Sequence, residues 1–171
     1  IVCTLNTGEI ILLEAYTSFS NREYKKSCNY MARHYSNQIK KNHDYEETKK
    51  VICLNIMMGN FQKVNEEIVN SYIIKNRITN KIINTGEMEI VLIRLDKVSK
   101  IVYTENRFIK WLKFINAKDF LELEKIGKDD EIMEHSIEYL KSYCGSSEDH
   151  NFEDYVAEKE YLAKKEGILD T

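Results

Sequence analysis

The chain has 171 residues, of which 43% are apolar and 31% charged, with six glycines, no proline and a net charge of −3. This composition excludes an intrinsically disordered chain, a collagen-like protein and a proline-rich linker, and it leaves enough apolar residues for one sizeable core. No run approaches the roughly 20 apolar residues of a membrane-spanning helix and no secretory signal pattern opens the chain, so we expect a cytoplasmic protein without a membrane partner.

The first forty residues predict two strands and one long helix. Residues 1–5 and 9–16 are typical of strands joined by a turn, and the centre of the second strand is continuously apolar. A cap at Ser20 or Asn21 and apolar residues at helical spacing then predict a helix with one buried stripe. The stripe consists of Tyr24, Cys28, Met31, Tyr35 and Ile39.

Three further strands and a helical region follow. The apolar run 51–58 predicts a central strand covered on both faces, and segments 68–75 and 88–95 predict two more. From residue 105 the apolar spacing becomes helical. We therefore expect an α/β core over residues 1–118 and a helical C-terminal region over residues 119–171.

The two expected parts carry opposite charge. Residues 1–118 hold 19 basic and 12 acidic side chains, a net charge of +7, whereas residues 119–171 hold 6 and 16, a net charge of −10. A basic core suits a phosphate-backbone partner, which an acidic appendage could screen or compete with. The alternative is an ordinary solvated surface of a lysine-rich chain.

One carboxylate stands out at the end of the second predicted strand. Glu14 closes an apolar run, where an unpaired carboxylate is costly to bury. A carboxylate on a rigid core strand beside a basic helix suits a divalent cation that also takes water and a phosphate oxygen as ligands. The alternative is that the strand has simply reached solvent at this point.

Several motifs, in this order and spacing, resemble a nuclease family. Segment 8–14, the helix with Tyr30 and Gln38, the pair Asp44-Tyr45 and strand 51–56 resemble the core of the PD-(D/E)XK superfamily, and more narrowly the Rpn family of recombination-promoting nucleases, often labelled transposases. Later matching segments are 88–97, 108–114 and 129–162. The resemblance implies a restriction-endonuclease-like fold, with a central mixed sheet flanked by helices and a helical C-terminal region.

The resemblance also implies Mg²⁺-dependent cleavage of DNA phosphodiester bonds, with a strand aspartate and glutamate holding the metal. Glu14 matches the glutamate, and the carbonyl of Ala15 matches a main-chain metal ligand. Tyr16 stands where the family has a lysine or glutamine that positions the attacking water, so Glu14 and Tyr16 are the catalytic candidates. The expected aspartate would fall immediately before Ile1, outside the sequence.

Basic and amide side chains near the predicted helix are candidates for DNA contact. Lys26 falls where the family often has arginine, and Gln38 falls on a recurring glutamine. Lys40 and Lys41 could contact phosphates, or simply end a helix in solvent.

Three functions stay open. The first is a Mg²⁺-dependent DNA endonuclease of the transposase group, and the second is a catalytically inactive nuclease-fold module for DNA binding or protein interaction. Tyr16 and the aspartate outside the sequence favour the second. The third is a regulatory chain whose acidic region occupies the basic face. A homo-oligomer is possible in each case.

Overall fold

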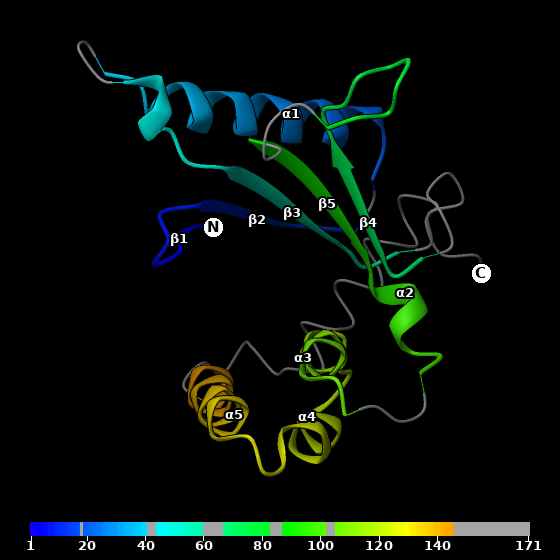
Figure 1. Cartoon of the computed structure of the whole chain (residues 1–171). Helices are drawn as coiled ribbons and strands as arrows, with labels where there is room; N and C mark the ends of the chain where they lie inside the picture. Colours follow the sequence, from blue (N-terminus) through cyan, green and yellow to red (C-terminus); the bar gives the residue numbers. More distant parts are fainter. Residues whose placement is uncertain (18, 41–43, 60–66, 83–86, 102–104, 146–171) are drawn as a thin grey trace. The chain divides into compact units, whose positions relative to one another are not determined.

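We analysed a computed structural model of the chain that describes residues 1–17, 19–40, 44–59, 67–82, 87–101 and 105–145 (Figure 1). Contacts divide the chain into two compact units, one of residues 1–57 with 61–94 and one of residues 58–60 with 95–171. The division after Arg94 separates the sheet from the helices that follow it. The boundary after Lys118, drawn from charge, stays a prediction.

The first unit is built on a mixed five-stranded sheet with the strand order β1-β2-β3-β5-β4. Strands β2, β3 and β5 run parallel, and β1 and β4 pair antiparallel with their neighbours. Each strand falls inside a segment that the sequence predicted as a strand. The strands are β1 (Val2–Thr4), β2 (Ile10–Tyr16), β3 (Val51–Met57), β4 (Val69–Ile73) and β5 (Met88–Arg94).

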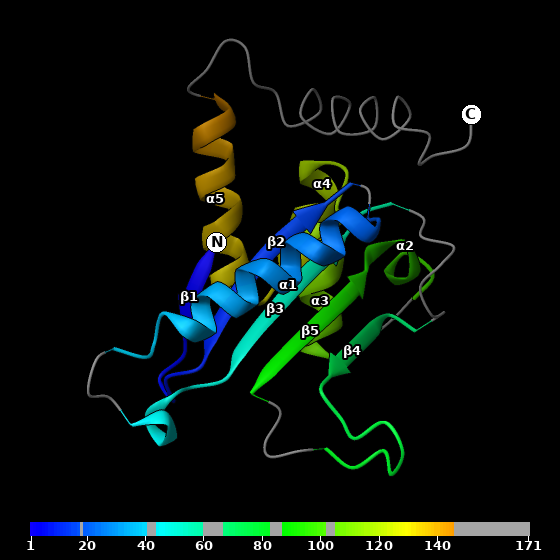
Figure 2. The ribbon, with the colours of Figure 1, turned by 90° about the horizontal axis from the view of Figure 1, so that it is seen from above.

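The core of this unit lies between the sheet and one helix, α1 (Asn21–Ser36), which Figure 2 shows lying along β2 and β3. The predicted central strand β3 contributes Val51, Cys53 and Met57, all fully buried. The side chains of β3 point alternately to the two faces of the sheet: those on the face toward α1 are buried, whereas Ile52 and Leu54 on the opposite face are partly buried.

The start of α1 agrees with the sequence prediction. The hydroxyl of Ser20 accepts a hydrogen bond from the backbone N–H of Arg22, and the carboxylate of Glu23 accepts one from the backbone N–H of Ser20 at 2.9 Å. This reciprocal capping box satisfies backbone donors that would otherwise lack partners.

The end of α1 and its buried face differ from the prediction. The helix ends at Ser36, so Gln38 and Ile39 lie beyond it. Met31 is buried as expected, but Tyr24 is 44% exposed and the fully buried residue of this turn is Ser27. A serine is small enough to let the helix lie close to β3, and a buried hydroxyl needs a hydrogen-bond partner there.

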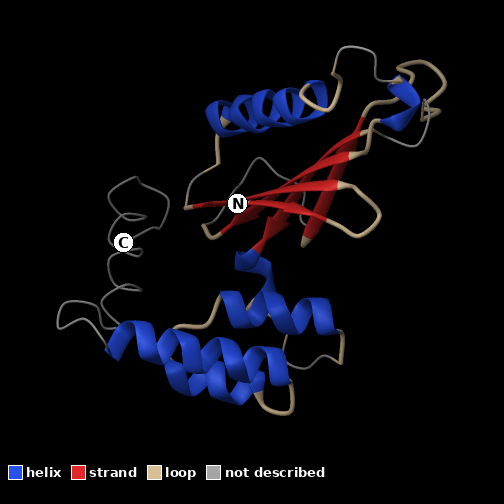
Figure 3. Cartoon of the chain, turned by 90° about the vertical axis from the view of Figure 1, so that its left-hand side faces the viewer, coloured by secondary structure: helices blue, strands red, loops and turns tan. Residues whose placement is uncertain are grey.

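The described part of the second unit is helical and contains α2 to α5, which are drawn in blue in Figure 3. They are α2 (Leu95–Val98), α3 (Arg107–Ile115), α4 (Phe120–Gly127) and α5 (Glu131–Gly145). Phe114 of α3, Leu123 of α4 and Met133 of α5 share one buried cluster, so residues on both sides of Lys118 fold together. The predicted helical segment 151–165 lies outside the described residues. None of the described helices is long and apolar enough to cross a membrane.

Candidate active site

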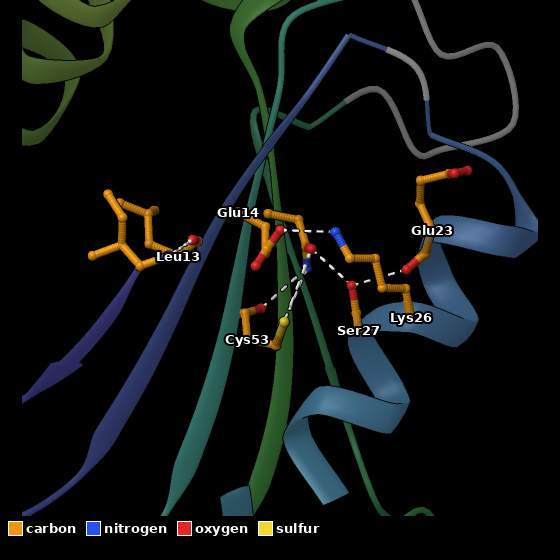
Figure 4. Close-up of polar contacts among 8 residues, drawn as sticks. Leu13, Glu14, Glu23, Lys26, Ser27 and Cys53 are labelled. Carbon is orange, nitrogen blue, oxygen red and sulfur yellow. Dashed lines mark hydrogen bonds and ion pairs between the residues drawn. The ribbon is translucent and has the colours of Figure 1, made fainter. Parts of the chain in front are cut away.

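Glu14 lies near the carboxyl end of β2, on the face that α1 covers. Its Oε2 accepts a hydrogen bond from Lys26 Nζ of α1 at 3.1 Å (Figure 4). The side chain of Glu14 is 23% exposed and that of Lys26 is 42% exposed. The hydrogen bond to Glu14 is the main cause of the raised pKa of Lys26, which keeps the ammonium charged. The strand has therefore not simply reached solvent, because its carboxylate is half-buried and paired.

Tyr16 lies two residues further along β2, on the same face. The Lys26 ammonium is 5.3 Å from the centre of the Tyr16 ring and 5.2 Å from that of Tyr30, so it lies within cation–π range of both rings. Burial raises the pKa of the Tyr16 hydroxyl, and the charge of Lys26 only partly opposes this, so the hydroxyl is neutral near pH 7. The hydroxyl oxygen is buried and has no hydrogen-bond partner among the described residues.

A buried polar pair, Ser27 and Asn55, supports this arrangement and was not predicted. Asn55 of β3 is directly opposite Glu14 in the parallel register. Its Oδ1 accepts a hydrogen bond from Ser27 Oγ at 2.8 Å, and its Nδ2 donates to the carbonyls of Cys53 and Val91 at 3.2 and 3.3 Å. Ser27 and Asn55 are both fully buried, so their bond fixes α1 on β3 and holds the neighbouring Lys26 beside Glu14.

The whole chain, residues 1–171, matches the PD-(D/E)XK nuclease family transposase model. The chain belongs to this family. The match confirms the superfamily that the motifs indicated, and the mixed sheet with flanking helices is its restriction-endonuclease-like α/β fold. No curated protein and no solved structure matched the chain. The narrower Rpn resemblance, the oligomeric state and the cytoplasmic location stay predictions.

PD-(D/E)XK nucleases generally use divalent metals, so the donor set around Glu14 decides whether a cation fits. Among the described residues no group of three or more His, Cys, Asp or Glu side chains could hold a metal. However, Glu14 pairs with Lys26 only through Oε2, and its Oε1 accepts no hydrogen bond from a described residue. Mg²⁺ commonly takes one or two carboxylates together with waters and substrate phosphates, so Glu14 Oε1 is available to such a cation, and the Ala15 carbonyl as a second ligand stays a prediction.

The pairing of β1 with β2 bears on the aspartate that the PD-(D/E)XK motif requires. Val2 lies opposite Leu12, and the backbone nitrogen of Ile1 donates to the carbonyl of Leu13 at 2.9 Å. Continued by one position, this register would place a residue before Ile1 opposite Glu14 and on the same face of the sheet. The register therefore agrees with the motif spacing, and the aspartate itself stays a prediction.

Gln38, another predicted DNA contact, lies beside Lys49 just before β3 begins, away from Glu14 near the end of β2. The side chain of Gln38 is bonded to the backbone of Lys49 on both sides: Nε2 donates to its carbonyl and Oε1 accepts from its N–H, both at 2.8 Å. These two hydrogen bonds therefore join the segment just after α1 to the segment just before β3. Lys40 is exposed beyond the end of α1, and Lys41 lies outside the described residues. Contact of these residues with DNA stays a prediction.

Proposed function

We propose that this chain is a Mg²⁺-dependent DNA endonuclease in which Glu14 is the metal-binding carboxylate. The observation that carries the proposal is the position of Glu14, half-buried on an inner strand with one oxygen paired to an ammonium and the other unpaired among the described residues. Family membership and the net charge of +7 over residues 1–118 support DNA as the partner.

The reaction would be hydrolysis of a phosphodiester. A water oxygen bonds to phosphorus while the bond from phosphorus to one sugar oxygen breaks, the water loses a proton to solvent, and the leaving oxygen gains one. Mg²⁺ would supply positive charge to the phosphate oxygens and acidify water. Glu14 Oε1 and the Ala15 carbonyl would hold it. The neutral Tyr16 hydroxyl has one proton to donate, and because the hydroxyl is buried, its side chain would have to turn toward solvent to reach a water or a phosphate oxygen.

A catalytically inactive module is the second candidate, and two features favour it. Tyr16 places a neutral phenol where the family has a lysine or glutamine, and no group of three or more His, Cys, Asp or Glu side chains that could hold a metal occurs among the described residues. Such a chain would bind DNA through its basic surface, or bind a protein, without cutting. Salt-dependent affinity for duplex DNA in the absence of cleavage would identify the first of these roles.

Nicking of supercoiled plasmid by the full chain separates the two candidates. Glu14→Gln removes the charge and keeps the shape, and Glu46→Gln, an exposed glutamate in the same unit, is the matched control. We expect Mg²⁺-dependent nicking by the wild type and the control, and a loss of about 100-fold or more in Glu14→Gln. Equal nicking by all three proteins would remove Glu14 from the mechanism, and no nicking at any Mg²⁺ concentration would favour the inactive module.

A further inference from the structure

We infer that Lys26, supplied by helix α1, is the positively charged group of this active site, and that it competes with the divalent cation for Glu14 until a DNA phosphate engages it. The inference rests on the proposed function for its catalytic part. Its competition with a cation can be measured without DNA.

The location of the Lys26 ammonium is the first observation. It is 3.1 Å from Glu14 Oε2 and 5.3 Å from the ring centre of Tyr16. A charged side chain at position 16 would extend into the space that this ring occupies. The helix therefore brings a positive charge to the side chain that replaces the family's lysine or glutamine.

The bonding capacity of the ammonium is the second observation. An ammonium has three N–H donors, and Glu14 is the one hydrogen-bond partner of Lys26 among the described residues. The side chain of Lys26 is 42% exposed, so a phosphate can approach the other two donors from solvent. The buried bond between Ser27 and Asn55 holds the adjacent backbone, which limits the reorganisation that phosphate binding requires.

The opposite charges of Lys26 and Glu14 lead to an effect that can be measured. In the free chain the ammonium neutralises Glu14, and a cation must bind Glu14 against that neighbouring positive charge. Removing the charge of Lys26 should therefore strengthen cation binding and weaken DNA cleavage. A residue with a purely structural role would not move these two quantities in opposite directions.

The test compares Lys26→Gln with Lys25→Gln, a variant of the preceding residue, which is exposed and has no side-chain partner among the described residues. Mn²⁺ binding to the free full-length chain is measured by electron paramagnetic resonance or calorimetry. We expect affinity to rise about fivefold in Lys26→Gln, as suits a partly exposed ion pair, and to stay unchanged in Lys25→Gln. In Glu14→Gln the site should lose Mn²⁺.

The second arm measures DNA cleavage. We expect Lys26→Gln to lose about 100-fold and Lys25→Gln to stay within about twofold of the wild type. The double variant Lys26→Gln/Tyr16→Lys should regain at least about tenfold over Lys26→Gln, because it returns a positive charge from the strand.

The outcomes distinguish the two proposals. Unchanged or weaker Mn²⁺ binding in Lys26→Gln, or Mn²⁺ binding that survives Glu14→Gln, overturns the competition. Cleavage by Lys26→Gln at the wild-type rate overturns its catalytic part and leaves the proposed endonuclease standing. A wild type that never cleaves, with tighter Mn²⁺ binding in Lys26→Gln, refutes the endonuclease and supports the competition.

Discussion

Removing the hydroxyl of Ser27 should destabilise the first unit far more than the loss of one oxygen atom suggests. Ser27 and Asn55 are both fully buried, and Asn55 Oδ1 accepts a hydrogen bond from the hydroxyl of Ser27 in α1. Ser27→Ala leaves that buried acceptor with only the weak Cys53 thiol donor at 3.9 Å, which costs about 1–3 kcal/mol of unfolding free energy. Asn55→Leu removes the amide with its bonds to Ser27 and to the carbonyls of Cys53 and Val91, together with its long contacts to Cys53 Sγ, and it should cost about 2 kcal/mol.

The double variant isolates the interaction between the two side chains. Once Asn55 has become apolar, Ser27→Ala no longer leaves an unpaired acceptor, because replacing both partners with apolar groups is close to neutral. Ser27→Ala/Asn55→Leu should therefore be less destabilised than the sum of the single variants, by about 1–2 kcal/mol. Ser36→Ala, at the exposed end of the same helix, should stay within about 0.5 kcal/mol of the wild type.

The assay must report on the first unit. The single tryptophan, Trp111, belongs to α3 of the second unit, so its fluorescence follows other contacts. Hydrogen exchange of the β3 amides, measured as a function of urea concentration, gives the free energy of unfolding of the first unit, which the Ser27–Asn55 pair affects. Additive losses in the double variant would refute the reasoning, because they would show that Ser27 and Asn55 do not depend on each other.

Three further predictions follow from particular contacts. Burial raises the pKa of Glu89, but hydrogen bonds from Lys50 and Ser71 outweigh it and lower that pKa below its usual value. The stabilisation from the Glu89 carboxylate is therefore complete above its unfolded pKa of about 4.3 and is lost as the pH falls through its folded pKa. Ser71→Ala should therefore move acid unfolding, monitored by circular dichroism, to higher pH. Gln38→Ala should cost about 1–2 kcal/mol in urea unfolding, because it breaks both bonds to Lys49, and should leave the salt dependence of DNA binding unchanged. If Lys40 contacts a phosphate, Lys40→Gln should reduce the slope of log affinity against log salt by about 1 for every duplex sequence, and an unchanged slope would exclude the contact.

Strands β2, β3 and β5 could be predicted because each contains an apolar run of strand length, and those runs hold most of the buried residues of the sheet. The end of α1 was harder to predict, because Ile39 continues the helical spacing although the helix ends at Ser36. Only the three-dimensional contact between Gln38 and the backbone of Lys49 explains that end. The helix propensities of these residues do not depend on such a contact and therefore cannot predict it.

The site was predictable in part, for a physical reason. Glu14 was found because a carboxylate breaks an apolar run, and the same signal was available at Asn55, which interrupts the run of β3, and at Arg94, which ends that of β5 and is 1% exposed. The pairing of Lys26 with Glu14 could not be found in this way. It depends on how α1 lies across β2, and the spacing within either element does not determine that distance.

The role of Glu14 is tested most directly by the Mg²⁺ dependence of plasmid nicking by the full chain and by Glu14→Gln, measured side by side at the same protein concentration. If Glu14 holds the metal, nicking by the wild type rises with Mg²⁺, disappears with a chelator, and is reduced about 100-fold or more in Glu14→Gln. Nicking at the same rate by both proteins would exclude Glu14 as the metal-binding carboxylate.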